Sequence, residues 1–297
     1  MFERPKVCVL PVAGYSTRNL PATKAIHKGF LTLDNLPIIQ YAVNQCKEIG
    51  IEEIVFVYNN EVSKKVFENY FSKNEALEKS LKDKGKTDIL QKLQAVIPDG
   101  MKFSFAEQKE PKGSGHAVLM AKDIVGKRNF VVMYVDDVYV NKKGDCVLKQ
   151  LLDVYNKTGG MVENIMKFPR EEMTRYGVLS GVEEDKNGKI VYAKGLVEKP
   201  KLEDVPSEYA SMGPYILPNE IMDILPQLGK GSNGEINLTD AINSAAQSGT
   251  KLVGVLCEGE RFDCGTNEEL AKANIRLSLI NHPELREYTK KVLSELE

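Results

Sequence analysis

The apolar residues in the first half of the chain fall into short runs separated by stretches with helical spacing. Short apolar runs bounded by turn residues are typical of buried strands. Helical spacing covers residues 37–48 and 116–124, and the stretch 61–93 is polar and helical, which predicts a solvated surface. Strands and helices that alternate in this way predict a parallel sheet with helices on both faces. The predicted strands are residues 7–12, 53–58, 103–107 and 130–135.

The second half of the chain shows shorter strand patterns separated by turn signals. Helical spacing returns at residues 219–227 and 238–247. From residue 268 onward the pattern is mostly helical, with a break at 281–283. The predicted strands of this half are residues 176–180, 190–193, 196–199, 210–217 and 252–256.

No internal repeat, low-complexity tract or linker divides the sequence, so we predict one mixed α/β domain over residues 1–297. Hydrophobic residues make up 42% of the chain, enough for a full core, and the formal net charge is −2. That balance argues against a general nucleic-acid or membrane-surface binder. No apolar run approaches the ~20 residues of a membrane span.

Five cysteines are scattered along the chain without the spacing of a zinc site. They are typical of reduced structural thiols, and we expect a cytoplasmic protein.

One loop in the first half carries an unusual concentration of cations. Between the strand at 7–12 and the helix that begins near 37, the connection is far longer than the usual roughly 2–6 residues. It lies at the carboxyl end of a strand, where open α/β sheets bind ligands. Its cations, Arg18, Lys24 and Lys28, stand among small residues that let a ligand reach backbone N–H groups. This combination favours a polyphosphate site over the alternative, a solvated turn.

Known phosphate-binding motifs narrow the possibilities. The chain has no Gly-x-x-x-x-Gly-Lys-Ser/Thr sequence, and it reads Ala13-Gly14-Tyr15-Ser16 where a dinucleotide fingerprint needs Gly-x-Gly-x-x-Gly. The loop instead resembles the sugar-nucleotide pyrophosphorylase motif, Gly-x-Gly-Thr-Arg followed by Pro-x-Thr-Lys and a second lysine. The tetrapeptide Pro21-Ala22-Thr23-Lys24 narrows the resemblance to bacterial UTP–glucose-1-phosphate uridylyltransferases.

The resemblance implies a single Rossmann-like nucleotidyltransferase domain with a mixed, mainly parallel central sheet and a small β subregion. Residues 1–140 would form a nucleotide-binding half, 141–266 a sugar-binding half and 267–297 a C-terminal helical extension. The implied reaction is Mg²⁺-dependent transfer of the uridylyl group from UTP to glucose 1-phosphate, which gives UDP-glucose and pyrophosphate.

In the first loop, the resemblance gives Arg18 and Lys28 catalytic roles in stabilising the leaving pyrophosphate. Ala13 and Gly14 would contact the nucleotide through backbone groups, and Lys24 would support phosphate binding. Catalysis by such cations needs no protein nucleophile, because positioning and charge neutralisation dominate phosphoryl transfer.

A second matching segment, residues 108–117, follows a strand and opens a helix. In the family its counterpart clamps uracil, which implies that Gln108 and Gly113 bind the base. Alone, the segment is also typical of a helix N-terminus with glycines for tight packing. His116 is predicted to be structural.

Carboxylates follow a strand and recur near the C-terminus. Asp136 and Asp137 end the strand predicted at 130–135, and Asp263 lies in Phe262-Asp263-Cys264-Gly265. Magnesium prefers one or two carboxylates together with substrate phosphates. The resemblance implies that Asp136 and Asp263 hold one Mg²⁺, with Asp137 a weaker candidate for Asp136's place. An isolated Asp-Asp pair after a strand is usually only a turn or a helix cap.

The second half supplies the predicted sugar site. Glu198-Lys199-Pro200 resembles the family's Glu-Lys-Pro, in which the glutamate binds sugar hydroxyls and the lysine the sugar phosphate. Lys199 is therefore the third predicted catalytic residue. Gly177 and Gly213 match segments that line the sugar pocket, and residues 234–241 resemble Gly-Glu-Ile-Gln-Leu-Thr-Asp-Ala.

The chain departs from the family pattern at several positions. Ser16 replaces a glycine, so a positive φ there would be strained. His27 replaces a proline within a stretch, 27–32, that also lacks a glutamate and a second proline, which predicts a mobile or reshaped loop. Lys109 replaces a glycine and Pro214 an arginine, which puts the rate and the choice of sugar in question.

Three functions stay open at this point. The chain is an active uridylyltransferase, a nucleotidyltransferase for dTTP or another sugar 1-phosphate, or a weakly active relative that regulates a partner. The presence of every predicted cation and carboxylate favours the first. We also expect a homodimer or homotetramer built through the helical extension, although those helices could equally cover their own sheet.

Overall fold

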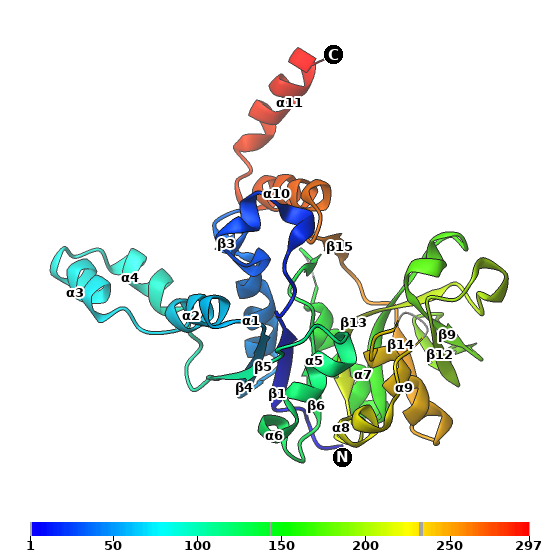
Figure 1. Ribbon diagram of the computed structural model, residues 1–297. Coiled ribbons are helices and arrows are strands. Elements are labelled where there is room, and N and C mark those ends of the chain that lie inside the picture. The colour runs from blue at the N-terminus through cyan, green and yellow to red at the C-terminus, as the bar shows by residue number, and fades with distance from the viewer. Residues whose placement is uncertain (1, 143, 232–233, 297) are drawn as a thin grey trace.

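The computed structural model describes residues 2–142, 144–231 and 234–296, which form one α/β domain around a central mixed sheet (Figure 1). Among these residues the sheet has eleven strands. Nine follow the order β10-β11-β14-β8-β13-β6-β1-β4-β5, with β9 joined to β13 and β12 to β9. The strands are β1 (Val7–Pro11), β4 (Glu53–Tyr58), β5 (Lys102–Glu107), β6 (Phe130–Val132), β8 (Met161–Lys167), β9 (Gly177–Ser180), β10 (Glu183–Glu184), β11 (Ile190–Ala193), β12 (Gly195–Glu198), β13 (Tyr209–Leu217) and β14 (Leu252–Val255).

The first half forms the parallel part of the sheet. β1 pairs in parallel with β4 and β6, and β4 pairs in parallel with β5. The four predicted strands are confirmed, but the last is shorter than expected. Met133 N–H still bonds to Val9 O, at 3.2 Å, whereas Asp137 N–H closes a turn on Tyr134 O. The chain therefore leaves the sheet before it reaches Asp136.

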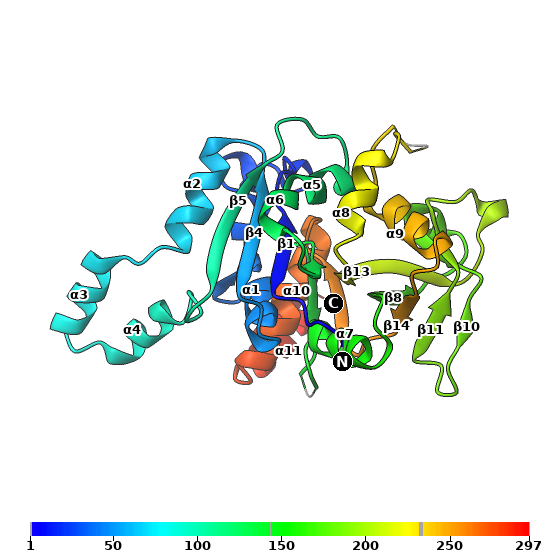
Figure 2. The same cartoon turned by 90° about the horizontal axis from the view of Figure 1, so that it is seen from below.

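Alternate residues of β1 enter two separate cores, as side chains on a strand must. Val7 and Val9 pack with α5, α8 and α9 on one face, whereas Cys8 and Leu10 pack with α1 and α7 on the other. Helices thus cover both faces, as predicted (Figure 2). Their bounds are α1 (Ile38–Glu48), α5 (Ser114–Met120), α6 (Lys122–Val125), α7 (Val147–Thr158), α8 (Ile221–Ile224) and α9 (Leu238–Gln247).

Residues 147–167 form two elements that the sequence analysis did not predict. Helix α7 and strand β8 fill residues 147–167, and β8 lies in the middle of the sheet between β14 and β13. The polar residues Glu163 and Asn164 interrupt its apolar pattern although both are buried. They are buried because they serve hydrogen bonds inside the fold, which apolar periodicity does not detect.

Two helical parts project from the body (Figure 1). One contains α2 (Glu61–Tyr70), α3 (Glu75–Asp83) and α4 (Thr87–Gln94) and matches the solvated surface predicted for residues 61–93. The other contains α10 (Asn267–Asn281), which packs on β15 (Glu260–Asp263), and α11 (Leu285–Leu296), which extends outward. Within the described ranges, no helix is long and apolar enough to cross a membrane.

Candidate active site

The long first loop has regular local structure. It folds into three 3₁₀ turns, η1 (Thr17–Asn19), η2 (Ala22–Lys24) and η3 (Lys28–Phe30), followed by the hairpin of β2 (Thr32–Leu33) and β3 (Leu36–Pro37). Residues 27–32 lie in η3 and at the start of the hairpin, and the expectation of a mobile or reshaped loop stays a prediction. The loop begins at the carboxyl end of β1 and brings Arg18 and Lys28 to Asp136, in the turn after β6.

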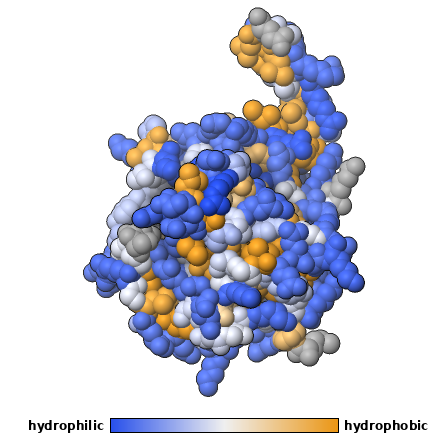
Figure 3. Space-filling view, turned by 90° about the vertical axis from the view of Figure 1, so that its right-hand side faces the viewer, coloured by the Kyte–Doolittle hydropathy of each residue, from blue (hydrophilic) through white to orange (hydrophobic). Residues whose placement is uncertain are grey.

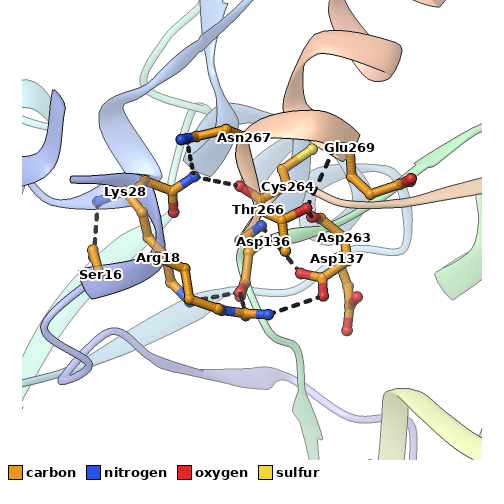
Figure 4. Close-up of polar contacts among 12 residues, drawn as sticks. Ser16, Arg18, Lys28, Asp136, Asp137, Asp263, Cys264, Thr266, Asn267 and Glu269 are labelled. Atoms are coloured by element: carbon orange, nitrogen blue, oxygen red, sulfur yellow. Dashed lines mark hydrogen bonds and ion pairs between the residues drawn. The ribbon is translucent and has the colours of Figure 1, made fainter. Parts of the chain in front are cut away.

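Two cations of this loop meet two carboxylates (Figure 4). The Lys28 Nζ atom lies 2.6 Å from Asp136 Oδ2. One guanidinium group, that of Arg18, faces both acids, with Nη2 at 3.7 Å from Asp136 Oδ2 and Nη1 at 3.3 Å from Asp263 Oδ2. Four of the predicted site residues, some more than a hundred positions apart in the sequence, are thus brought into one charged cluster.

The environment of Asp136 keeps it ionised. Burial acts to raise its pKa, but Lys28 and Arg18 outweigh that effect, so the pKa lies below its usual range. Its backbone oxygen also accepts a 2.8 Å hydrogen bond from Cys264 N–H, which ties the turn after β6 to the end of β15. A Cβ at Gly265 would lie 2.6 Å from Asp136 Oδ2, so any larger residue there would displace the charged side chains of the cluster.

Asp137 has a different partner from Asp136. Asp137 is the first residue of β7 (Asp137–Val140), which pairs antiparallel with β15. In this pairing Asp137 lies opposite Asp263. The Asp137 carboxylate forms an ion pair with Arg261, which is also largely buried. Burial raises the pKa of Asp137 to about 7, although the Arg261 charge opposes that rise. Because Asp137 is already paired with the buried Arg261, Asp136 is the better candidate to face a ligand.

Other predicted residues of the first loop lie around this cluster. Ala13 is buried just after β1, whereas Gly14 is exposed with open space where a Cβ would stand. Lys24 is exposed and makes no ion pair with any residue described. Of these three positions, Gly14 and Lys24 are the two that are open to solvent.

The predicted base clamp forms a compact unit. Gln108 is 5% exposed, and its Nε2 donates to Gly113 O at 3.2 Å and lies 3.0 Å from His116 Nδ1. Gly113 adopts a φ of +110°, and a Cβ there would lie 2.5 Å from Ile236 O. Glycine is therefore required at this position. Burial lowers the pKa of His116, with Lys112 adding to the effect, which fits its predicted structural role.

The predicted sugar residues form a second group at the end of β12. Thr239 Oγ1 donates to Glu198 Oε2 at 2.8 Å, so α9 aligns this carboxylate. A Cβ at Gly177 would lie 3.4 Å from the same Oε2 atom. Lys199 has a positive φ of 44°, and its Nζ is 3.6 Å from Glu198 Oε1. The lysine side chain is half-exposed, as a residue that meets a ligand must be.

Gly213 is held by two residues that the sequence analysis missed. Its carbonyl oxygen accepts hydrogen bonds from Tyr139 Oη at 2.9 Å and from Asn164 Nδ2 at 3.2 Å. Tyr139 lies on β7, the strand that begins at Asp137, so the sugar segment and the carboxylate cluster share a support. Neither residue belongs to a motif that would have singled it out.

Tyr134 connects the electrostatics of the two groups. Burial first of all raises the pKa of Tyr134, and the Asp137, Glu198 and Asp136 carboxylates add to the effect. The Tyr134 hydroxyl group is thus within electrostatic range of acids from both groups. Among the described residues, no ion pair joins the two groups.

Comparisons with known proteins place the chain in a family. A nucleotidyl transferase family model matches residues 8–278. A UTP–glucose-1-phosphate uridylyltransferase of Pseudomonas aeruginosa is 39% identical over 270 residues, covering 90% of this chain and 94% of that protein.

Solved structures are similar along nearly the whole chain. A UTP-bound UGPase from Acinetobacter baumannii is 33% identical with a TM-score of 0.86, covering 99% of this chain and all of that one. A UDP-glucose pyrophosphorylase complexed with UDP-glucose is 34% identical with a TM-score of 0.80, covering 92% and 98% of the two chains.

Proposed function

Because this chain belongs to the nucleotidyl transferase family, among its UTP–glucose-1-phosphate uridylyltransferases, we propose that it makes UDP-glucose and pyrophosphate in a Mg²⁺-dependent reaction. The observation that carries the proposal is the cluster of Arg18, Lys28, Asp136 and Asp263 at the carboxyl edge of the sheet. Two cations and two carboxylates converge there.

In the proposed reaction, a phosphate oxygen of glucose 1-phosphate attacks the α-phosphorus of UTP. A new P–O bond forms, and the bond to the β-phosphate oxygen breaks in line, so pyrophosphate leaves. Both substrates are strongly anionic, so the barrier is lowered mainly by charge neutralisation and orientation. Lys199 neutralises and orients the attacking phosphate, while Lys28 and Arg18 stabilise the charge that develops on pyrophosphate.

The carboxylates present fit a divalent cation. Asp136 and Asp263 face the same guanidinium group, so their oxygens already converge on one position, and both are hard oxygen donors of the kind Mg²⁺ takes. No group of three or more potential metal ligands occurs in the described part of the chain. Substrate phosphates would supply the remaining ligands. When bound, the ion would neutralise phosphate charge and polarise the α-phosphate.

Binding of substrate would be divided between the two groups of residues. Gln108 and Gly113 read the base, while Ala13, Gly14 and Lys24 contact the rest of the nucleotide. On the other side, Glu198 accepts hydrogen bonds from sugar hydroxyls, aligned by Thr239. Gly177 and Gly213 admit the sugar against backbone, since neither carries a side chain.

Pyrophosphate release tests this proposal directly. UTP, dTTP, CTP, ATP and GTP are each combined with several sugar 1-phosphates in a coupled assay, and we expect UTP with glucose 1-phosphate to be the fastest pair. A faster reaction with dTTP or another sugar would favour the second function. No turnover with any pair, alongside intact UTP binding, would favour a regulatory relative.

Assembly and location stay predictions. On α11 the apolar side chains of Leu285, Tyr288, Leu293 and Leu296 are exposed, and Figure 3 shows apolar surface on the projecting helix. This surface supports the proposed homodimer or homotetramer, which a solution mass measurement tests. The described cysteines are all free, in keeping with the expected cytoplasmic location.

A further inference from the structure

Two side chains of the first loop hold the turn that carries Lys28. The Lys28 backbone N–H donates to Ser16 Oγ at 3.2 Å, and the next N–H, that of Gly29, donates to His27 Nδ1 at 3.0 Å. These are the first two amides of η3, for which the turn itself supplies no acceptor. Figure 4 shows Ser16 beside Lys28. The side chains of Ser16 and His27 therefore fix the N-terminal end of the turn.

Ser16 is strained, and its hydrogen bonds account for its presence. Its backbone has φ 56° and ψ 33°, a left-handed conformation in which glycine is the default residue. A glycine would relax the backbone but has no hydroxyl to offer Lys28 N–H. The Ser16 carbonyl oxygen also accepts a 2.7 Å hydrogen bond from Thr23 Oγ1. The serine thus ties three parts of the loop to one point.

His27 serves as an acceptor in a buried place. The residue is 8% exposed, and its ring packs on Phe67 with 5.3 Å between centroids. Accepting from Gly29 requires a bare Nδ1, so the neutral ring carries its proton on Nε2, which has no partner in the described part of the chain. Burial first, and then the Lys28 charge, lower the pKa of His27 to about 4, so the ring stays neutral.

The backbone of His27 does not itself require histidine. Its φ of −70° would equally suit proline, so what the imidazole adds to the loop is the acceptor. At both positions a residue without a side-chain acceptor would suit the backbone conformation: glycine at position 16 and proline at position 27. Both acceptors are used on adjacent amides.

We infer that Ser16 and His27 are paired positioning residues that aim the Lys28 ammonium at Asp136 and at the phosphates bound there. The Lys28 side chain is 19% exposed and reaches Asp136 Oδ2 at 2.6 Å from the turn that the pair holds. A shift of that turn moves the charge, and small misplacements of catalytic groups are expensive in rate. This inference rests on the proposed function, because it assigns Lys28 to the triphosphate.

Amide exchange tests the clamp independently of activity. NMR of the unliganded protein measures exchange at the Lys28 and Gly29 amides in Ser16→Ala, His27→Ala and His27→Asn. We expect faster exchange at Lys28 in the first variant and at Gly29 in the second. His27→Asn should restore protection at Gly29, because asparagine Oδ1 is a good acceptor at the start of a helical turn. Unchanged exchange in both alanine variants would overturn the clamp even if the wild type proves inactive with UTP.

Kinetics test what the clamp does. Relative to wild type, Ser16→Ala, Ser16→Gly and His27→Ala should each lower kcat by roughly tenfold with little change in KM for glucose 1-phosphate. Glycine and alanine at 16 should behave alike in kcat, because both lack the hydroxyl although only glycine relaxes the backbone. The double alanine variant should lose less than the product of the single losses, since both changes release one turn.

A matched control is Ser72→Ala, which removes an exposed hydroxyl far along the chain and should leave kcat unchanged. Inactivity of the wild type would count against the proposed function alone. A loss confined to KM for glucose 1-phosphate, or a normal kcat in variants with released amides, would overturn the positioning role of Ser16 and His27.

Discussion

The Lys28 ammonium lies 2.6 Å from the Asp136 carboxylate, so the lysine and the acid proposed to act on the nucleotide neutralise each other in the free protein. A metal ion or a phosphate chain that binds here must exchange this contact for its own. The ion pair is mostly shielded from water, with side-chain exposures of 19% and 14%. It therefore holds both groups in place without the screening that weakens surface pairs.

The first prediction concerns Lys28. Lys28→Ala should depress kcat by about 10²–10³ and change KM for glucose 1-phosphate little, because the charge acts as pyrophosphate leaves. Lys28→Arg should rescue poorly, since a planar fork does not replace a compact ammonium. Steady-state kinetics with each substrate varied would decide. A near-normal kcat in Lys28→Ala would show that Lys28 has no catalytic role.

The second prediction concerns the carboxylates. Asp136→Asn and Asp263→Asn should each nearly abolish turnover while the fold persists, because Mg²⁺ binding needs their charge. Chelator should abolish wild-type activity, and added Mg²⁺ should restore it. Circular dichroism checks the fold, and Asp99→Asn, at an exposed site, serves as the control. Full activity in chelator would rule out the metal.

The sequence anticipated the parts of this fold that have clear periodicity. Apolar runs marked β1 and β4 because nearly every residue of these strands is buried, and the half-buried β5 was found by its alternating phenylalanines. The loop motif singled out Arg18 and Lys28, and the structure brings both beside Asp136. β8 was missed because its buried Glu163 breaks the apolar run. The clamp on Lys28 was missed as well, since it depends on the φ of Ser16 and on which ring nitrogen of His27 accepts.

The third prediction concerns base selection. Gln108→Ala should weaken UTP binding and blur the choice between UTP and CTP, because losing a buried hydrogen-bonding group costs about 1–3 kcal/mol. The change also releases Gly113 O and His116, so a thermal melt must accompany the titration. Gln91→Ala, on exposed α4, is the control. Unchanged UTP affinity in Gln108→Ala would mean that residues other than Gln108 bind the base.

The fourth prediction concerns the other phosphate. Lys199→Met keeps the length of the side chain but removes its charge, and it should mainly raise KM for glucose 1-phosphate. KM for UTP should change little, because Lys199 contacts Glu198, and no ion pair joins it to Asp136 or Asp263 among the described residues. Lys201→Met removes an exposed charge two residues away and should have no effect. A larger change in KM for UTP than in KM for glucose 1-phosphate would mean that Lys199 binds the nucleotide and not the sugar phosphate.

The last prediction uses pH to test a buried acid. Glu163 is 1% exposed, accepts a hydrogen bond from Ser211 Oγ, and has no partner for Oε1 among the described residues. Burial raises its pKa from 4.5 to about 8. The folded protein therefore keeps this proton while the unfolded chain loses it, and the free energy of unfolding should fall as pH rises from about 4.5 to about 8. A change of that kind amounts to a few kcal/mol at most, at ~1.4 kcal/mol per pKa unit.

Glu163→Gln should abolish this contribution, because the amide has nearly the same shape and does not ionise. Urea unfolding of both proteins at pH 6 and pH 9 measures the difference, with Glu183→Gln on the exposed strand β10 as the control. We expect wild type to lose more stability than Glu163→Gln between the two pH values, while the control follows wild type. Parallel losses in wild type and Glu163→Gln would mean that Glu163 is ionised in the folded protein. The fold would then have to supply a compensating charge beside β8.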